Sequence, residues 1–120
     1  MGAGLRDIAP KEVYSAKIDA AAGTGDVIVL DFSALHPNDS SKKIVVINFL
    51  YTCTTTNPTA FWSGSSSGTQ LTGDMIVMVN GWIKGGYNPD GHFKAAVGAD
   101  LVIERAASVG VGGWINYYLE

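Results

Sequence analysis

Short runs of alternating or β-branched apolar residues recur along the 120-residue chain, and residues typical of turns separate them. The pattern predicts strands at residues 12–18, 26–32 and 43–56, with flexible turn residues at 20–26 and a polar loop at 35–43. The third run is apolar on both faces, as expected for a central strand that is covered on each side. We therefore expect the first half of the chain to be all-β.

The second half continues the pattern, with apolar runs at residues 59–64, 69–86, 99–106 and 112–120. The run at 69–86 predicts two short strands joined by Asn80-Gly81, a pair that suits the positive φ angles of a tight hairpin turn. No segment has a convincing helical period, and the one candidate, "HFKAAVGADL", is interrupted by a glycine.

These runs add up to about eight strands, with turn residues every 8–12 positions. This spacing is typical of a sandwich or barrel, and eight strands in two sheets is the strand number of a jelly roll. The sequence thus predicts an all-β, single-domain antiparallel β-sandwich of the jelly-roll type at residues 12–120. Residues 1–11 are expected to form an N-terminal arm.

The stretch "GGYNPDGHF" at residues 85–93 is dense in glycine and holds one of the two histidines. Within it, Asn88, Pro89, Asp90 and Gly91 match the four positions of a type I turn. His92 would follow at the exit of this turn. Turn geometry therefore accounts for the composition without any chemistry.

Composition limits the classes of partner. The net charge is −3 and no basic stripe is present, so nucleic acid and anionic membranes have little electrostatic basis as partners. Charged residues make up only 16% of the chain, below the usual quarter, which suggests that a second copy or a partner covers part of the surface. We expect no signal peptide and synthesis in a cytoplasm.

No catalytic pattern emerges. A nucleophilic triad would combine the serine-rich segment 63–68 with His36 or His92 and a carboxylate such as Asp74 or Asp90, but the segment lacks the spacing of a nucleophile elbow. Each histidine lies alone in its loop and is expected to be solvated or capped. We therefore expect no enzyme activity, no metal and no cofactor.

The cysteine and the carboxylates likewise show no spacing typical of a catalytic site. The single cysteine, Cys53, lies in an apolar run and is expected to be a buried, inert thiol. No pair of carboxylates stands out as the acid and base of a glycosidase. The candidates weighed were Asp19, Asp26, Asp31, Asp100 and Glu104.

Aromatic residues carry the more informative pattern. In "WINYY" the alternation places Trp114, Asn116 and Tyr118 on one strand face and Ile115, Tyr117 and Leu119 on the other. Both faces are substantially apolar, so we expect an oligomer interface at Trp114, Asn116, Tyr118 and Trp82. The alternative is a sugar-stacking platform formed by Trp62, Trp82 and Tyr87.

A resemblance covers most of the chain, from about Tyr14 to Tyr118. Its motifs are a "KKI-V-VINF" strand, "AFWSGSSSGTQLTGDM", "NGWIKGGYNPDGHFKAAVGADLVIE" and "GGWINYY". In this order they resemble a group of small proteins that are encoded in tailed-bacteriophage genomes and are usually interpreted as virion structural proteins. This chain departs from the group by its longer "LHPNDSSKK" loop and its N-terminal "GAGLRDIAPKE" segment.

The resemblance implies a non-enzymatic role in the phage particle. The expectation is a capsid decoration or cement protein on the head surface of the virion, a homotrimer that binds the major capsid protein. The alternative is a tail or head fibre or a carbohydrate-binding module. In the arm, Leu5, Arg6, Asp7 and Ile8 are the expected capsid contacts.

Overall fold

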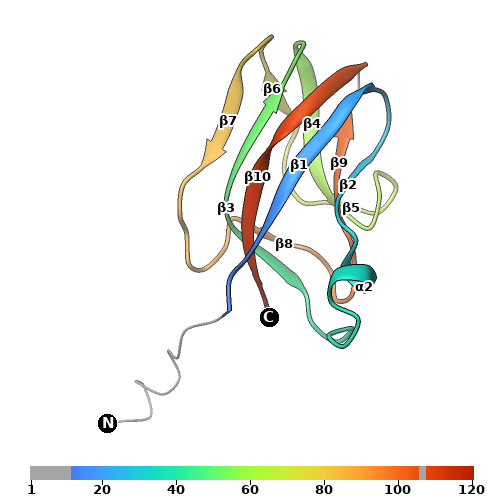
Figure 1. The fold of residues 1–120 in the computed structure, drawn as a ribbon, viewed down its shortest axis with the longest axis vertical. Coiled ribbons are helices and arrows are strands. Elements are labelled where there is room, and N and C mark those ends of the chain that lie inside the picture. Colours follow the sequence, from blue (N-terminus) through green and yellow to red (C-terminus); the bar gives the residue numbers. More distant parts are fainter. Residues whose placement is uncertain (1–11, 106–107) are drawn as a thin grey trace.

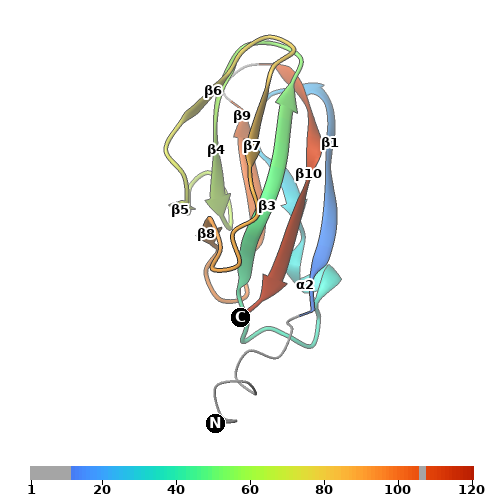
Figure 2. The same ribbon diagram turned by 90° about the vertical axis from the view of Figure 1, so that its left-hand side faces the viewer.

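Two antiparallel β-sheets pack face to face in the computed structural model of the chain, which describes residues 12–105 and 108–120 (Figure 1). The expected arm and its contacts, Leu5, Arg6, Asp7 and Ile8, lie outside the described residues. Figure 2 shows the two layers from the side, with the sheet that contains β1 and β10 on the right. The predicted all-β sandwich is therefore confirmed.

Sheet 1 contains, in spatial order, β1 (Tyr14–Gly23), β10 (Val109–Leu119), β3 (Ile44–Cys53) and β7 (Trp82–Gly85), while β8 (Phe93–Lys94) also pairs with β3. Sheet 2 contains β2 (Val27–Leu30), β9 (Leu101–Arg105), β4 (Asn57–Ser63) and β5 (Thr69–Gln70), while β6 (Met75–Val77) also pairs with β4. All of these pairs are antiparallel.

The ten strands within the described residues occupy eight positions. β7 and β8 pair with different parts of β3, and β5 and β6 pair with different parts of β4, so each couple is one edge strand with an interruption. Counted in this way, each sheet has four positions, and the chain passes repeatedly from one sheet to the other. This is the arrangement of a jelly roll. The sequence predicted the number of positions but not the two interruptions.

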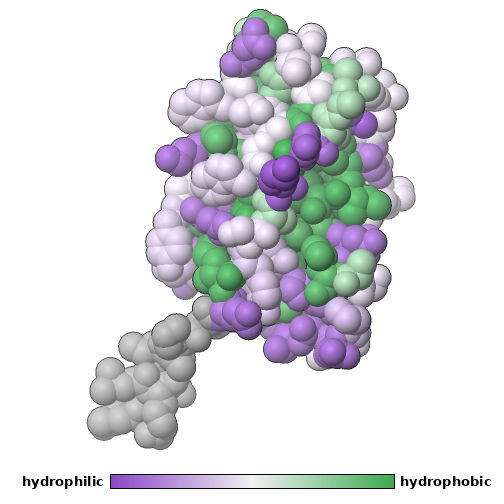
Figure 3. Space-filling model, in the orientation of Figure 1, coloured by the Kyte–Doolittle hydropathy of each residue, from purple (hydrophilic) through white to green (hydrophobic). Residues whose placement is uncertain are grey.

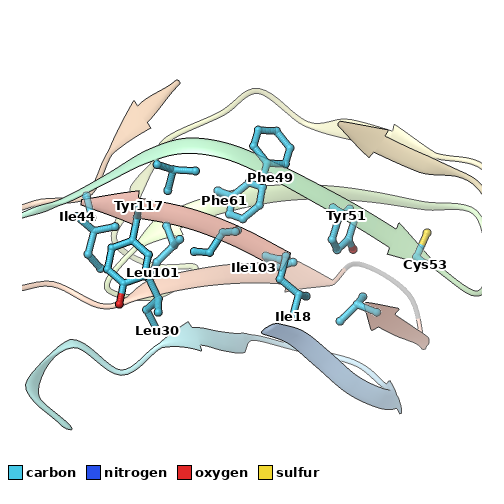
Figure 4. Close-up of a cluster of buried hydrophobic side chains, with 14 of the residues drawn as sticks. Ile18, Leu30, Ile44, Phe49, Tyr51, Cys53, Phe61, Leu101, Ile103 and Tyr117 are labelled. Atoms are coloured by element: carbon cyan, nitrogen blue, oxygen red, sulfur yellow. The ribbon is translucent and has the colours of Figure 1, made fainter. Parts of the chain in front are cut away.

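The core lies between the sheets and is formed by the inward side chains of both (Figure 4). Phe49 and Tyr51 from β3 meet Phe61 from β4 with ring centroids 5.4 and 6.5 Å apart. Ile18 of β1 and Ile103 of β9 are also almost completely buried. The long apolar run predicted as a central strand is indeed central, since β3 lies between β10 and the β7–β8 edge.

Two local predictions need correction. Asn80 has the expected positive φ of 56°, and the Gly81 amide donates to the Met78 carbonyl, but the flanking strands lie in different sheets, so the turn does not close a hairpin. A four-residue helix, α2 (Phe32–Leu35), follows β2 where no helix was expected. The Asp31 side chain caps α2 by accepting a hydrogen bond from the Ala34 amide.

Two further predicted segments can be compared with the structure: one strand is longer than predicted, and one turn is formed as predicted. β1 extends to Gly23, into the predicted turn at residues 20–26, because Ala20 still pairs with β10 and a register shift absorbs the next two positions. The predicted type I turn at residues 88–91 is present: the Gly91 amide donates to the Asn88 carbonyl at 2.9 Å. The Asn88 side chain also accepts from the Asp90 amide.

Arg105, at the end of β9, holds together one end of the sandwich. Its guanidinium donates to four backbone carbonyls, those of Ala21, Thr24, Gly25 and Val109, at 2.9–3.2 Å. These carbonyls belong to the end of β1, the β1–β2 turn and the start of β10. Because guanidinium offers several donors in a rigid plane, one side chain fixes three chain segments.

We expect Arg105→Ala to lower the free energy of unfolding by about 2 kcal/mol, because hydrogen bonds from a charged donor are lost together. Arg105→Lys should recover part of the loss, since an ammonium keeps the charge but cannot reach all four carbonyls. Urea unfolding measures both values, and Lys84→Ala, an exposed cation on β7, is the control. Equal stability of Arg105→Ala and the control would contradict this role.

Candidate functional site

The outer face of sheet 1 carries the residues expected at an oligomer interface. Trp114 and Asn116 of β10 alternate with the buried Ile115, so they point away from the core. Trp82 of β7 lies on the same face, because its neighbour Ile83 packs against the core, and its side chain is 64% exposed. The structure therefore brings Trp114, Asn116 and Trp82 together on one surface. Whether that surface binds another copy stays a prediction.

Tyr118 is on the same face but is covered within the subunit. It is only 7% exposed and forms a small apolar cluster with Val45 and Ile47 of β3. The 88–91 turn packs on this cluster: a Cβ on Gly91, whose φ is 89°, would lie 2.4 Å from a Val45 methyl. Part of the apolar surface that the sequence assigned to a neighbouring subunit is thus covered by the chain's own turn.

The alternative sugar platform is not assembled as expected. Trp62 lies in β4 of sheet 2, between the buried Phe61 and Ser63, so it faces outward on the opposite side of the sandwich from Trp82. Tyr87 is exposed in the segment that interrupts the β7–β8 edge strand. Trp62, Trp82 and Tyr87 therefore do not form one surface.

A different set of residues does come together beside Trp82. Strand register places Asp19 of β1, Gly112 of β10, Thr52 of β3 and Trp82 of β7 opposite one another in one row across sheet 1. All four face outward, because their neighbours along each strand point into the core. The row carries a carboxylate, a bare backbone, a hydroxyl and an indole, from one edge of the sheet to the other.

A shallow depression of about 520 Å³ begins at the middle of this row, where Thr52 and Gly112 line it, while Asp19 and Trp82 lie outside its lining. It is lined by Ala20–Ala22, Thr52–Thr54, Asn80, Gly81 and Gly110–Gly112. The depression exists because Gly110 and Gly112 have no side chains to fill the outer face of β10. In Figure 3, which views this face, pale residues fill its upper middle between scattered hydrophilic ones.

A second groove runs along the side of the sandwich where β1 passes β2. Its lining includes Ala16 and Val29 as well as Leu35, which is 54% exposed. A hydrophobic area is visible beside β1 in Figure 3. β1 is an edge strand of ten residues that pairs on one side only. We call this surface the β1–β2 groove; an unpaired edge next to apolar residues is a typical site for strand or loop docking.

His36 lies at the inner wall of this groove and corrects a sequence expectation. It is 8% exposed, not solvated, and its Nε2 is 2.8 Å from the Tyr117 hydroxyl. Tyr14 and Phe32 contact the imidazole ring with their own rings. The "HPND" motif therefore contributes a buried packing residue, because the short α2 helix turns His36 back toward the core.

Another apolar surface projects at one end of the molecule. Ile76, Met78 and Val79, in and after β6, are 66%, 62% and 56% exposed. We call these three residues the crest. They lie at the end where β3 finishes and β4 begins, as the pairing of Ile76 with Pro58 shows. β1 starts at the opposite end, because Tyr14 pairs with Tyr117 near the end of β10 (Figure 1).

The groups considered for catalysis have structural partners. The Ser63 hydroxyl accepts from the Ala96 amide, while Ser65 and Ser67 bond to each other. His92 bonds to the Gly86 carbonyl.

Three carboxylates of the sequence analysis bind backbone amides as well. Asp31 caps α2, Asp100 accepts from the Phe32 amide, and Asp26 accepts from the Ser66 amide. The Ser66 contact fixes the serine-rich loop against the start of β2. Each of these carboxylates therefore has a local role in chain geometry.

Metal and thiol chemistry find no assembled site in the part of the chain that the structure describes. No three His, Cys, Asp or Glu side chains gather there closely enough to hold an ion. Cys53 is 3% exposed, as predicted, and burial raises the pKa of its thiol. No helix among these residues is long and apolar enough to cross a membrane.

Comparison with known proteins adds no family assignment. No protein-family model matches the sequence, and no curated protein matches it at a significant level.

The Tyr117–His36 pair gives a prediction on pH. Burial, with a smaller contribution from Tyr14, raises the pKa of Tyr117 from 10.0 to about 12. The folded state therefore favours the protonated phenol: this stabilisation is complete below pH 10 and is lost as the pH rises toward 12. Tyr117→Phe should flatten that alkaline loss of stability.

At neutral pH the same substitution should lower the free energy of unfolding by about 1 kcal/mol, because His36 loses its partner. Thermal unfolding from pH 7 to pH 12 measures both effects. Tyr87→Phe, at an exposed tyrosine, is the control. A Tyr117→Phe protein with the alkaline profile of the wild type would exclude the pair as the cause.

Proposed function

We propose that this protein is a non-enzymatic structural component of a tailed-bacteriophage virion, a decoration or cement protein that binds the major capsid protein on the head surface as a homotrimer. The proposal rests on the sequence resemblance and on one structural observation. That observation is the presence of two separate apolar surfaces, the crest and the β1–β2 groove, on a rigid sandwich.

A trimeric protein that coats a lattice needs two kinds of contact, one with its sister subunits and one with the lattice. The crest suits the first contact, because Ile76, Met78 and Val79 project from the end of the molecule and could meet around a threefold axis. Burying large exposed apolar side chains there contributes about 25 cal/mol for each Å² removed from water.

The β1–β2 groove suits the contact with the capsid. Its residues Tyr14 and Leu35 lie toward the end of the sandwich where β1 begins. The N-terminal arm joins the chain at this same place, since it directly precedes β1 in sequence. If the subunits join at the crest, each trimer would present three arms and three grooves to the lattice. Three simultaneous contacts would bind more tightly than a single weak contact.

Three charged groups at the C-terminal end of β10 and beside it pair with one another. Lys94 Nζ lies 3.0 Å from both carboxylate oxygens of Glu120, and Lys43 Nζ lies 3.4 Å from one of them. The hydrogen bond from Lys94 is the main reason that the pKa of Glu120 is lowered. Because these charges pair with one another, we assign the lattice contact to the apolar groove and the arm.

The crest is tested by the triple variant Ile76→Thr, Met78→Thr, Val79→Thr, which should convert the trimer to a monomer in sedimentation velocity at micromolar concentration. Threonine is β-branched, like isoleucine and valine, and it removes apolar surface. Ile28→Thr is the matched control, since Ile28 is 59% exposed but lies on β2. A wild-type chain that sediments as a monomer would overturn the trimer.

Attachment is tested on phage particles. Deletion of residues 2–11, or Leu35→Ser in the groove, should reduce the occupancy of the protein on purified heads, measured by quantitative mass spectrometry, while the trimer persists. The crest variant should also lose occupancy, but through loss of the trimer. Complete absence of the wild-type protein from purified virions would exclude the virion role, and full occupancy after both changes would exclude the arm and the groove as the contact.

A further inference from the structure

We propose that the row formed by Asp19, Gly112, Thr52 and Trp82 on the outer face of sheet 1 is a saccharide-binding site. This inference is independent of the virion role, because it concerns a surface that neither the crest nor the β1–β2 groove uses. It also differs from the sugar platform expected from the sequence, of which it retains only Trp82.

The row has the chemistry that a sugar ring requires. A pyranose has an apolar face of C–H groups and a rim of hydroxyls, so its sites combine an exposed aromatic ring with hydrogen-bonding groups. Trp82 is 64% exposed at one edge of the sheet. Asp19 is exposed at the other edge, and it forms no hydrogen bond or ion pair with the residues that the structure describes. Thr52 adds a hydroxyl between them.

The glycine strand supplies the space. At Gly112 an added Cβ would lie 3.2 Å from the Thr52 hydroxyl oxygen, so a side chain there would crowd the hydroxyl that a ligand needs. Gly110 continues the bare surface along β10 within the depression of about 520 Å³. Three gaps between neighbouring strands separate Asp19 from Trp82, or about 14 Å, which is enough for a short oligosaccharide.

A second indole lies on the same face of β10, next to the row. Trp114 is two positions from Gly112 on the same face of β10, and register places Lys17, Leu50 and Lys84 in its row. Trp114 is half-buried between these neighbours. A ligand centred over Gly112 would therefore have Trp114 two positions away along β10 and Trp82 two strands away across the sheet.

A sister subunit fits this face less well than a sugar does. The exposed charges of Lys17, Asp19 and Lys84 are distributed among the tryptophans, whereas the core of an oligomer interface is depleted of charged residues. The row contains one carboxylate, and hydrolysis of a glycosidic bond ordinarily uses two. We therefore assign binding without cleavage.

The test uses purified ¹⁵N-labelled protein, titrated separately with maltose, cellobiose, lactose and chitobiose and followed by amide and indole N–H chemical shifts. At least one sugar should shift the signals of Gly112, Thr52 and the Trp82 indole in a saturable manner. Dissociation constants of about 0.1–10 mM are expected for so open a site.

Trp82→Ala should weaken the binding of that sugar at least about tenfold, and Asp19→Asn should weaken its binding severalfold. Tyr87→Ala is the matched control, because Tyr87 is an exposed aromatic residue outside the row, and it should leave the affinity within about twofold of the wild type. Unchanged thermal unfolding of Trp82→Ala and Asp19→Asn shows that the fold is retained, and Asp19→Asn alone suffices if Trp82→Ala unfolds.

Three outcomes would overturn the site: no sugar shifts the signals of the row, a sugar binds but shifts signals elsewhere, or Trp82→Ala leaves the affinity unchanged. A Trp82→Ala protein that sediments as a smaller species, with no sugar effect, would identify the row as a protein interface and would equally reject the proposal. Because no phage particle enters the experiment, its failure says nothing about the virion role.

Discussion

Pairing of β10 with two strands at once is the interaction on which the rest of the structure depends. β10 lies between β1 and β3 in sheet 1, so it connects the edge strand β1 to the central strand β3. Close approach at the middle of the strand requires glycine: a Cβ on Gly113, whose φ is 133°, would lie 1.9 Å from the Leu50 carbonyl oxygen. The backbone there can pair with β3 only because no side chain intervenes.

The same glycine-rich sequence shapes the outer surface. Where Gly110 and Gly112 of β10 have no side chains, little fills the solvent face of the sheet, and a depression forms that Thr52 and Asn80 also line. A requirement of strand pairing thus produces a surface that can accept a ligand. Farther along β10, Tyr117 faces the core and Tyr118 faces outward, where it clusters with Val45, the residue against which the 88–91 turn packs. One strand therefore contributes to the core, to a covered surface and to an open one.

The fold could be predicted from sequence because each strand carries its own signal. Alternation in residues 112–120 correctly placed Trp114 and Tyr118 on one face and Tyr117 on the other. The two interrupted edge strands could not be predicted, because whether "TQLTGDMIV" forms one strand or two depends on its pairing with β4. α2 was missed because a helix of one turn has too few positions to show a period.

The candidate site was harder to predict than the fold for a physical reason. Asp19, Thr52, Trp82 and Gly112 lie on four strands, and only the register between those strands places them in one row. Composition suggested an aromatic platform but selected Trp62, which the fold places on the other sheet. His36 was likewise expected in solvent, since nothing in "HPND" indicates that its side chain would form a hydrogen bond with Tyr117, 81 positions later.

The position of β10 in the chain also has a consequence for biosynthesis. As the ribosome makes the protein, β1 and β3 emerge long before the strand that separates them, and both must wait with unpaired edges. Contacts between residues so far apart in sequence form slowly, and exposed edges favour association with other nascent chains. Efficient production should therefore depend on conditions that protect incomplete chains, such as slower translation at low temperature.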